Sequence, residues 1–219
     1  AGSFRPLEVI TKEGTIFHAT GNAPHGYYFE TRIRLYDMLW QCMAKAVPEL
    51  LPAGHFASIC GTVLAGKHPD TGRNYTMVEP QMGGWGATST RDGLDAMYSC
   101  SHGETFNCPV EICETRYGLD VGYKRLNEEV GGAGKYMGGR GLAVSYKPRA
   151  ETILSAGYSR NKKPVWGSNG AEGGGTNGLS VKRTDGLVEE FSFVSGLLVK
   201  PGDEIIIQTA NGGGWGRKS

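Results

Sequence analysis

The stretch "GLAVSYKP", residues 141–148, is the first of five short apolar runs that decide the fold. The others follow at short intervals and are "TILSAGYS" (152–159), "LSVKRT" (179–184), "LVEEFSFV" (187–194) and "DEIIIQT" (203–209). Apolar runs of this length, bounded by Gly, Pro, Asn and Asp, predict strands separated by turns. "KPGD", residues 200–203, predicts a tight turn because proline pre-sets φ and glycine accepts positive φ. The C-terminal third is therefore predicted to be all-β, with glycine-rich loops.

Upstream, the clearest helix is predicted from about Glu30 to Val47. Apolar residues recur there at spacings of three and four, which is typical of an amphipathic helix, and Pro48 and Pro52 end it. "LEVITKEGTIFHA" (7–19) suits two short strands around a turn at Glu13–Gly14. "HFASICGTVLAG" (55–66) and "NYTMVEP" (74–80) suit a hairpin across "KHPDTGR".

The whole chain is therefore predicted to be α+β with strands dominating. We expect residues 1–130 to form a mixed α/β region and residues 131–219 a β-rich region, within one continuous folded unit.

Composition excludes several functional classes. The 219 residues carry a net charge of +1 without a basic stripe, which argues against nucleic acid as a partner. No apolar run reaches the roughly 18 residues that a membrane helix requires. Glycine is abundant, 35 residues, about twice its usual share. Five cysteines, an odd number, predict a reducing, cytoplasmic setting.

The stretch "GGAGKYMGGRG" (131–141) places glycines around Lys135 and Arg140, as a phosphate-binding loop would. The Walker A spacing fails at both ends, because Glu129 stands where its first glycine belongs and Tyr136 follows the lysine. The dinucleotide-binding pattern fails at Met137. We therefore expect these glycines to serve tight turns that lead into the next strand.

The stretch "YSCSHGETFNCPVEICE" (98–114) contains the possible zinc ligands Cys100, His102, Cys108 and Cys113. Their spacing fits no common zinc knuckle, so buried free thiols are favoured over a structural zinc. Glu111 and Glu114 share one face if a helix follows Pro109. They suit an acid/base pair, metal carboxylates or two solvated glutamates.

A third glycine-rich stretch, "GGWGATSTRDGLDA" (83–96), lets the backbone around Trp85 approach another chain or a ligand closely. Arg91, Asp92 and Asp95 follow it, and no histidine lies nearby in sequence before His102. Composition alone identifies this segment as a candidate functional loop.

Five ordered segments resemble the C-terminal part of the B-type subunit of the hydantoinase/oxoprolinase family, which includes N-methylhydantoinases, 5-oxoprolinases and acetone and acetophenone carboxylases. These segments are "FRPLEVITKEGTIFHA", "MGGWGATSTRDGLDA", "NCPVEICE", "GGAGKYMGGRGLAVSY" and "PGDEIIIQTANGGGWG". The resemblance implies an ATP-dependent enzyme that carboxylates a ketone or opens a cyclic amide. It implies that ATP binds to a larger A-type partner, and a divalent metal to an N-terminal part of the B-type subunit that has no counterpart here.

The resemblance also implies which residues of this chain matter. The catalytic candidates are Asp92, Asn107 and Glu111. The candidates for contact with the small carbonyl substrate or a partner are Trp85, Arg91, Asp95, His102, Lys135 and Arg140. No metal ligand is assigned, and His18, His25, His55 and His68 are not promoted to that role. The alternative is a non-catalytic module that holds the larger subunits together.

Overall fold

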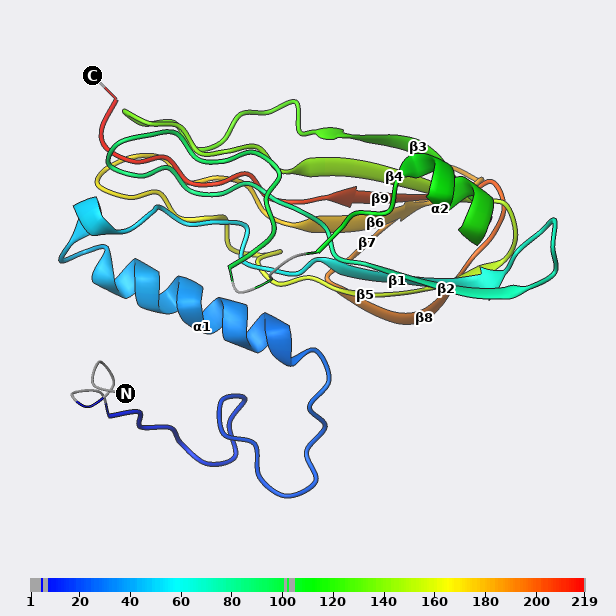
Figure 1. Ribbon diagram of the computed structural model, residues 1–219, viewed down its shortest axis with the longest axis horizontal. Coiled ribbons are helices and arrows are strands. Elements are labelled where there is room, and N and C mark those ends of the chain that lie inside the picture. The colour runs from blue at the N-terminus through cyan, green and yellow to red at the C-terminus, as the bar shows by residue number, and fades with distance from the viewer. Residues whose placement is uncertain (1–4, 6–7, 101, 103–104, 219) are drawn as a thin grey trace.

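The computed structural model describes residue 5 and residues 8–100, 102 and 105–218. Two antiparallel sheets form its body, with strand orders β2-β1-β5-β8 and β3-β4-β9-β6-β7 (Figure 1). The strands are β1 Gly61–Lys67, β2 Asn74–Glu79, β3 Leu119–Leu126, β4 Leu142–Pro148, β5 Thr152–Gly157, β6 Gly178–Lys182, β7 Val188–Phe191, β8 Phe193–Val199 and β9 Glu204–Gln208. The helices are α1 Tyr28–Met43 and α2 Val110–Tyr117, and a 3₁₀ turn spans Pro48–Leu50. The predicted strand-dominated α+β fold is confirmed.

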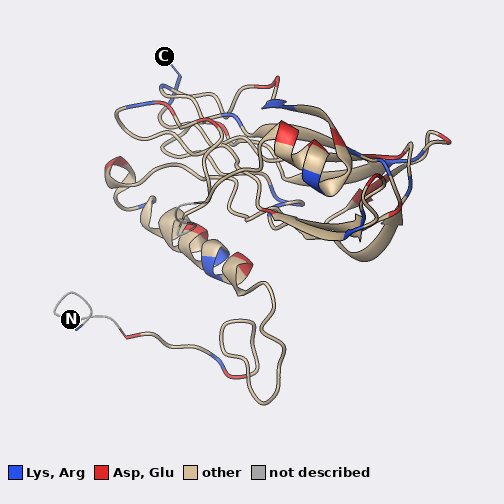
Figure 2. Cartoon of the chain, turned by 45° about the vertical axis from the view of Figure 1, so that its right-hand side comes forward, with Lys and Arg blue, Asp and Glu red and all other residues tan. Residues whose placement is uncertain are grey.

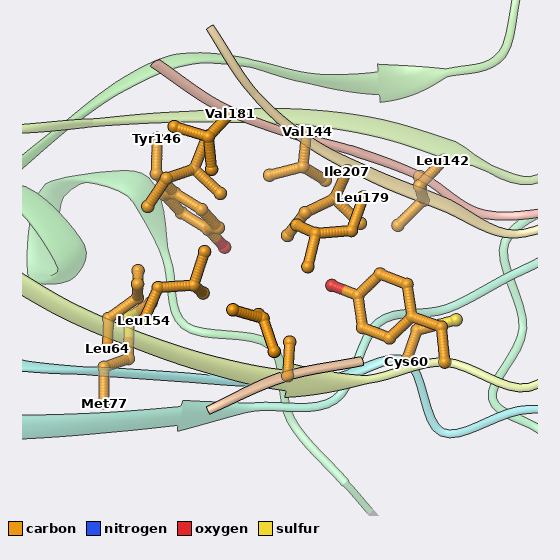
Figure 3. Packing of buried hydrophobic residues seen from close by; sticks show 14 of the residues in the cluster. Cys60, Leu64, Met77, Leu142, Val144, Tyr146, Leu154, Leu179, Val181 and Ile207 are labelled. Atoms are coloured by element: carbon orange, nitrogen blue, oxygen red, sulfur yellow. The ribbon is translucent and has the colours of Figure 1, made fainter. Parts of the chain in front are cut away.

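The hydrophobic core lies between the two sheets (Figure 3). Leu64 and Leu154 point into it from the four-stranded sheet, and Val144 and Ile207 from the five-stranded sheet, all fully buried. Alternate residues along each strand face this core because successive side chains of a strand point to opposite faces. Each such side chain stabilises the fold by about 1.5–3 kcal/mol relative to exposure. Both sheets contain strands from before and after residue 130.

Most of the predicted strands appear where the patterns placed them. β1 and β2 form the expected hairpin, with Lys67 opposite Asn74. The turn at "KPGD" is confirmed, since Asp203 N donates to the Lys200 carbonyl at 3.0 Å and Gly202 has φ +92°. The stretch "LVEEFSFV" does not form one strand as predicted. It is divided at Ser192, where the chain leaves the five-stranded sheet as β7 ends and continues in the four-stranded sheet as β8.

The N-terminal prediction was wrong in its details. From residue 8 onwards, the expected pair of strands is reduced to one isolated bridge between Thr15 and His18, and Leu7 lies outside the described residues. The segment before α1 lies away from the two sheets (Figure 1). α1 begins at Tyr28 and ends at Met43, four residues before the expected end. Val47 precedes proline, which disfavours helical backbone at that position, and its ψ is 61°.

Glycine-rich segments pack side by side at one end of the sandwich, and we call them the glycine bundle: residues 83–87, 131–141, 165–174 and 211–216. Gly132 N donates to the Gly212 carbonyl at 2.9 Å, and Gly212 N to the Gly139 carbonyl at 2.8 Å. A Cβ on Gly138 would lie 1.9 Å from the Gly212 oxygen. Residues 131–141 contain no hydrogen-bonded turn, so the expected tight turns are not found there. These glycines permit close contact between backbones.

Lysine, arginine, aspartate and glutamate are spread over the chain without a region of one sign (Figure 2). Neither helix in the described part of the chain has the length and apolar character needed to cross a bilayer.

Candidate functional site

Asp92 and Asp95 fasten the segment after "GGWGA" to the opposite glycine stretch. The Asp92 Oδ1 accepts a hydrogen bond from Met137 N at 2.8 Å, and the Asp95 Oδ1 accepts one from Arg140 N at 2.6 Å. Arg140 Nε lies 3.7 Å from Asp95 Oδ2 in a half-exposed ion pair. The structure thus brings together three of the predicted residues, and it shows both carboxylates binding backbone N–H groups.

A second group connects Trp85 with the "NCPVE" segment. Trp85 Nε1 donates to the Tyr98 carbonyl at 2.7 Å, and the Asn107 amide donates to the Tyr98 hydroxyl. The rings of Tyr98 and His102 meet edge to face, with centroids 5.1 Å apart. Desolvation, and then the charge of Arg32, lower the pKa of His102, so its imidazole is neutral at pH 7. A neutral imidazole beside a phenol and an amide can accept or relay a proton.

The other predicted residues are not brought into these groups. Glu111 is exposed in the first turn of α2, and the nearby Glu114 accepts a hydrogen bond from Val121 N at 3.1 Å. This use of Glu114 disfavours an acid/base pair. Lys135 lies over the Tyr136 ring, with Nζ 5.2 Å from its centroid, and Arg91 is exposed.

The possible zinc site is not assembled. Among the described residues, no three His, Cys, Asp or Glu side chains are placed to hold a metal ion. Burial, the first cause, raises the pKa of Cys100 to about 11 and that of Cys113 to about 12, so both are protonated thiols at neutral pH. Cys113 Sγ contacts Met77 Sδ at 3.7 Å within the core.

The stretch 131–141 does not form a phosphate cradle either. A cradle needs backbone N–H groups that point at the ligand. Here the N–H groups of Gly132, Lys135, Tyr136, Gly138 and Gly139 donate to protein carbonyls at 2.9–3.0 Å. Residues 131–141 therefore do not fit a nucleotide phosphate.

Sequence reasoning missed a buried polar cluster, which comprises Asp37, His55, Arg160 and Trp166. Asp37, on α1, is fully buried and accepts hydrogen bonds from Arg160 and from Trp166 Nε1, the latter at 3.0 Å. Arg34 Nη1 lies 2.9 Å from the same carboxylate. Asp37 and Ile33 are the buried residues of α1 that face the rest of the chain, whereas Leu39 and Met43 of the predicted apolar stripe are about half exposed. Apolar periodicity could not find Asp37, because this inward position is charged.

His55 is also fully buried, and its ring packs against those of Trp40 and Trp85, with centroids 5.6 Å and 5.1 Å away. Neither ring nitrogen has a hydrogen-bond partner among the described residues, and Nδ1 is 3.9 Å from Asp37 Oδ1. Desolvation lowers the pKa of His55 to about 4 despite the attraction of Asp37. The two arginines already neutralise that carboxylate, so we regard His55 as neutral rather than as part of an ion pair.

A second missed carboxylate, Glu79, joins both sheets to the "NCPVE" segment. It accepts hydrogen bonds from Cys108 N at 2.9 Å and Lys124 Nζ at 3.0 Å, and from the Tyr146 hydroxyl. Glu79 is 3% exposed, so it positions the residue next to Asn107 without meeting solvent. Burial, and then the charge of Glu79, raise the pKa of Tyr146, which stays protonated. In the sequence, Glu79 was visible only as a glutamate at the end of a predicted strand.

The sequence of the chain is similar to a known protein family and to individual members of it. A family model described as hydantoinase B/oxoprolinase matches residues 1–218. The B-type subunit of a putative D-/L-hydantoinase from Pseudomonas sp. (strain NS671) is 26% identical over 99% of this chain and 36% of its own length. The beta subunit of caprolactamase from Pseudomonas jessenii is 27% identical over 98% of this chain and 39% of its own length.

Two solved structures share the fold. ATP-dependent caprolactamase from Pseudomonas jessenii matches with a TM-score of 0.66 and 20% identity, over 81% of this chain and 32% of that one. Acetone carboxylase in its nucleotide-free form matches with a TM-score of 0.60 and 15% identity, over 82% of this chain and 30% of that one. The chain thus spans less than two fifths of the length of these relatives.

The family match covers nearly every residue, and the ordered glycine-rich motifs lie within it. The chain belongs to the hydantoinase B/oxoprolinase family.

Proposed function

We propose that this chain is a subunit, or the C-terminal portion of one, in a heteromeric ATP-dependent enzyme that acts on a carbonyl group. The observation that carries the proposal is the family match over residues 1–218. Hydrolytic ring opening of a cyclic amide is the favoured reaction, because the named sequence relatives are subunits of a hydantoinase and of a caprolactamase. Carboxylation of a ketone is the second candidate, supported by the fold shared with acetone carboxylase.

ATP and a divalent metal are proposed to bind to other polypeptides of the complex. The donors in this chain support that assignment for ATP, because most backbone N–H groups of residues 131–141 already donate hydrogen bonds to protein oxygens. The partners are an A-type subunit and the N-terminal part of a B-type subunit. The exposed apolar side chains of α1, such as Leu35, Leu39 and Met43, support a role in assembly.

Within this chain, the group around Trp85, Tyr98, His102 and Asn107 is proposed to form part of the wall that meets the small carbonyl substrate. It combines an aromatic surface with a neutral imidazole and an amide, which suits binding and proton movement near an amide. Asp92 and Asp95 act as positioning residues, because each holds a backbone N–H of the opposite loop. Glu111 remains a proposed catalytic residue, whereas Arg91, Lys135 and Arg140 are proposed to contact partners.

Alanine variants at Asp92, Asn107 and Glu111 separate the enzyme from the alternative, a non-catalytic assembly module. Each variant is assembled with the native partners and compared with Glu151→Ala, an exposed control. Turnover that falls while the complex stays intact supports the enzymatic role. A complex that dissociates, with unchanged turnover per assembled complex, supports the assembly module.

The compartment is proposed to be the cytoplasm. All five cysteines are free thiols in the structure, and three of them are buried. This state is typical of proteins in a reducing compartment.

A further inference from the structure

A polar hollow of about 430 Å³ lies on the outer face of the five-stranded sheet, and none of the candidate site residues lines it. β6, β7 and β9 form its floor, and the loop 159–164 forms one wall. Leu179 and Val181 of β6 point into the core, so Gly178 and Ser180 face outward. Gly178 has no side chain, and a Cβ there would have no neighbour closer than 4.0 Å. The hollow exists because this outward position of β6 is empty.

Most polar side chains around the hollow have no partner among the described residues. Within the described chain, none of the following six makes a side-chain hydrogen bond or an ion pair: Asn161, Lys162, Thr176, Ser180, Glu190 and Gln208. By contrast, Asn177 just beneath them uses its amide fully, toward the Phe56 and Ser159 carbonyls and Ala210 N. Such a set of unpaired donors and acceptors around a hollow of ligand size is typical of a small-molecule site.

Lys162 and Glu190, the two charged residues that line the hollow, have opposite signs and are connected to different positions along β6. Glu190 pairs with Ser180 in the register of β6 and β7. Lys162 belongs to the loop that is tied to the start of β6, where Asn177 N donates to the Arg160 carbonyl at 2.9 Å. Positions 177 and 180 are about 10 Å apart along an extended strand. Between these positions the floor carries the half-buried apolar side chain of Ile206.

We propose that this hollow binds a linear ω-amino acid, with its carboxylate at Lys162, its ammonium group at Glu190 and its aliphatic chain over Ile206. The distance along β6 between the positions to which Lys162 and Glu190 are connected favours this ligand over an α-amino acid, whose charged groups share one carbon. The hydroxyl and amide groups around the rim can complete the hydrogen bonds of both ends. A molecule of this class is what hydrolysis of a lactam releases, and that connection, unlike the site itself, rests on the proposed function.

Binding is tested on the full chain alone by isothermal titration with 6-aminohexanoate. Its isomer norleucine, hexanoate and hexylamine serve as ligand controls. We expect 6-aminohexanoate to bind about tenfold or more tightly than each control, because each control loses one correctly placed charge, and a charged hydrogen bond contributes about that factor. Absence of binding at millimolar concentrations, or equal binding of norleucine, would overturn the proposal.

Variants assign the binding to this hollow. Lys162→Gln and Glu190→Gln should each weaken 6-aminohexanoate about tenfold, whereas Lys163→Gln and Glu151→Gln should not. Gly178→Val fills the floor and suits a strand, so it should abolish binding while the urea midpoint of unfolding stays unchanged. Binding that survives Gly178→Val would contradict the assignment. Since none of these measurements uses turnover, failure of the proposed reaction would leave their outcome unchanged.

Discussion

Replacing Gly138 by alanine tests whether the glycine bundle depends on direct contact between backbones. The added Cβ would lie 1.9 Å from the Gly212 oxygen and 2.4 Å from its carbonyl carbon. The two segments must then separate by more than 1 Å, roughly, to restore a normal contact. Hydrogen bonds hold them together at this point, from Gly132 N to the Gly212 carbonyl at 2.9 Å and from Gly212 N to the Gly139 carbonyl at 2.8 Å.

The expected loss in the free energy of unfolding follows from these contacts. Two or three buried hydrogen bonds contribute about 1 kcal/mol each, and forced overpacking adds about 1–3 kcal/mol. We therefore expect Gly138→Ala to lower the free energy of unfolding by about 3–6 kcal/mol, a large part of the 5–15 kcal/mol typical of a domain.

Urea unfolding followed by circular dichroism measures the change. Gly175→Ala is the matched control, because its Cβ would meet only Asn211 N, at 3.9 Å, and its cost should stay below about 1 kcal/mol. If Gly138→Ala unfolds at the same urea concentration as Gly175→Ala, the close-contact explanation is refuted.

Three further variants test the buried cluster and the loop anchor. His55 has a pKa of about 4 in the folded chain and 6.5 in the unfolded chain, so the unfolded state binds more protons between these pH values. The free energy of unfolding therefore falls by about 3 kcal/mol in all as the pH drops from 6.5 to 4. His55→Leu should remove this part of the pH dependence in urea titrations, and an unchanged dependence on pH would contradict burial of a neutral imidazole. Asp37→Ala leaves Arg160 buried without its carboxylate partner and should lower the free energy of unfolding by about 3–5 kcal/mol. Thermal unfolding measures this change, with the exposed Glu49→Ala as control. A decrease of less than about 1 kcal/mol would show that the ion pair is not needed for stability. Asp95→Ala removes the acceptor for Arg140 N and should lower the free energy of unfolding by about 0.5–1.5 kcal/mol, whereas Arg91→Ala, at an exposed side chain, should leave it almost unchanged. Equal decreases for the two variants would contradict the anchoring role of Asp95.

Local patterns predicted the parts of the fold that local chemistry determines. The β1–β2 hairpin follows from two apolar runs around a turn, and the "KPGD" turn follows from proline and glycine. Ser192 shows the limit of that reasoning, because "LVEEFSFV" has the pattern of one strand while its halves join different sheets. Which sheet a strand joins depends on the packing of distant segments and not on the run itself.

The glycine bundle and the polar clusters illustrate the same limit for the site. The spacing of glycines along "GGAGKYMGGRG" does not reveal that their partners lie in residues 211–216, so turns were the local expectation. Asp92 and Asp95 were found through motifs, but their bonds to the backbone of residues 137 and 140 needed the folded chain. Asp37 was missed because helix periodicity treats a charged residue as outward, whereas Arg160 and Trp166 make it an inward one.

The central claim is that this chain is a required component of an ATP-dependent enzyme that acts on a carbonyl group. The most direct measurement is ATP hydrolysis by the native complex, with a lactam or a ketone plus bicarbonate as substrate, assembled with and without this chain. We predict substrate-dependent ATP hydrolysis only when the chain is present, and none by the chain alone. Full substrate-dependent turnover by a complex that lacks the chain would contradict the claim.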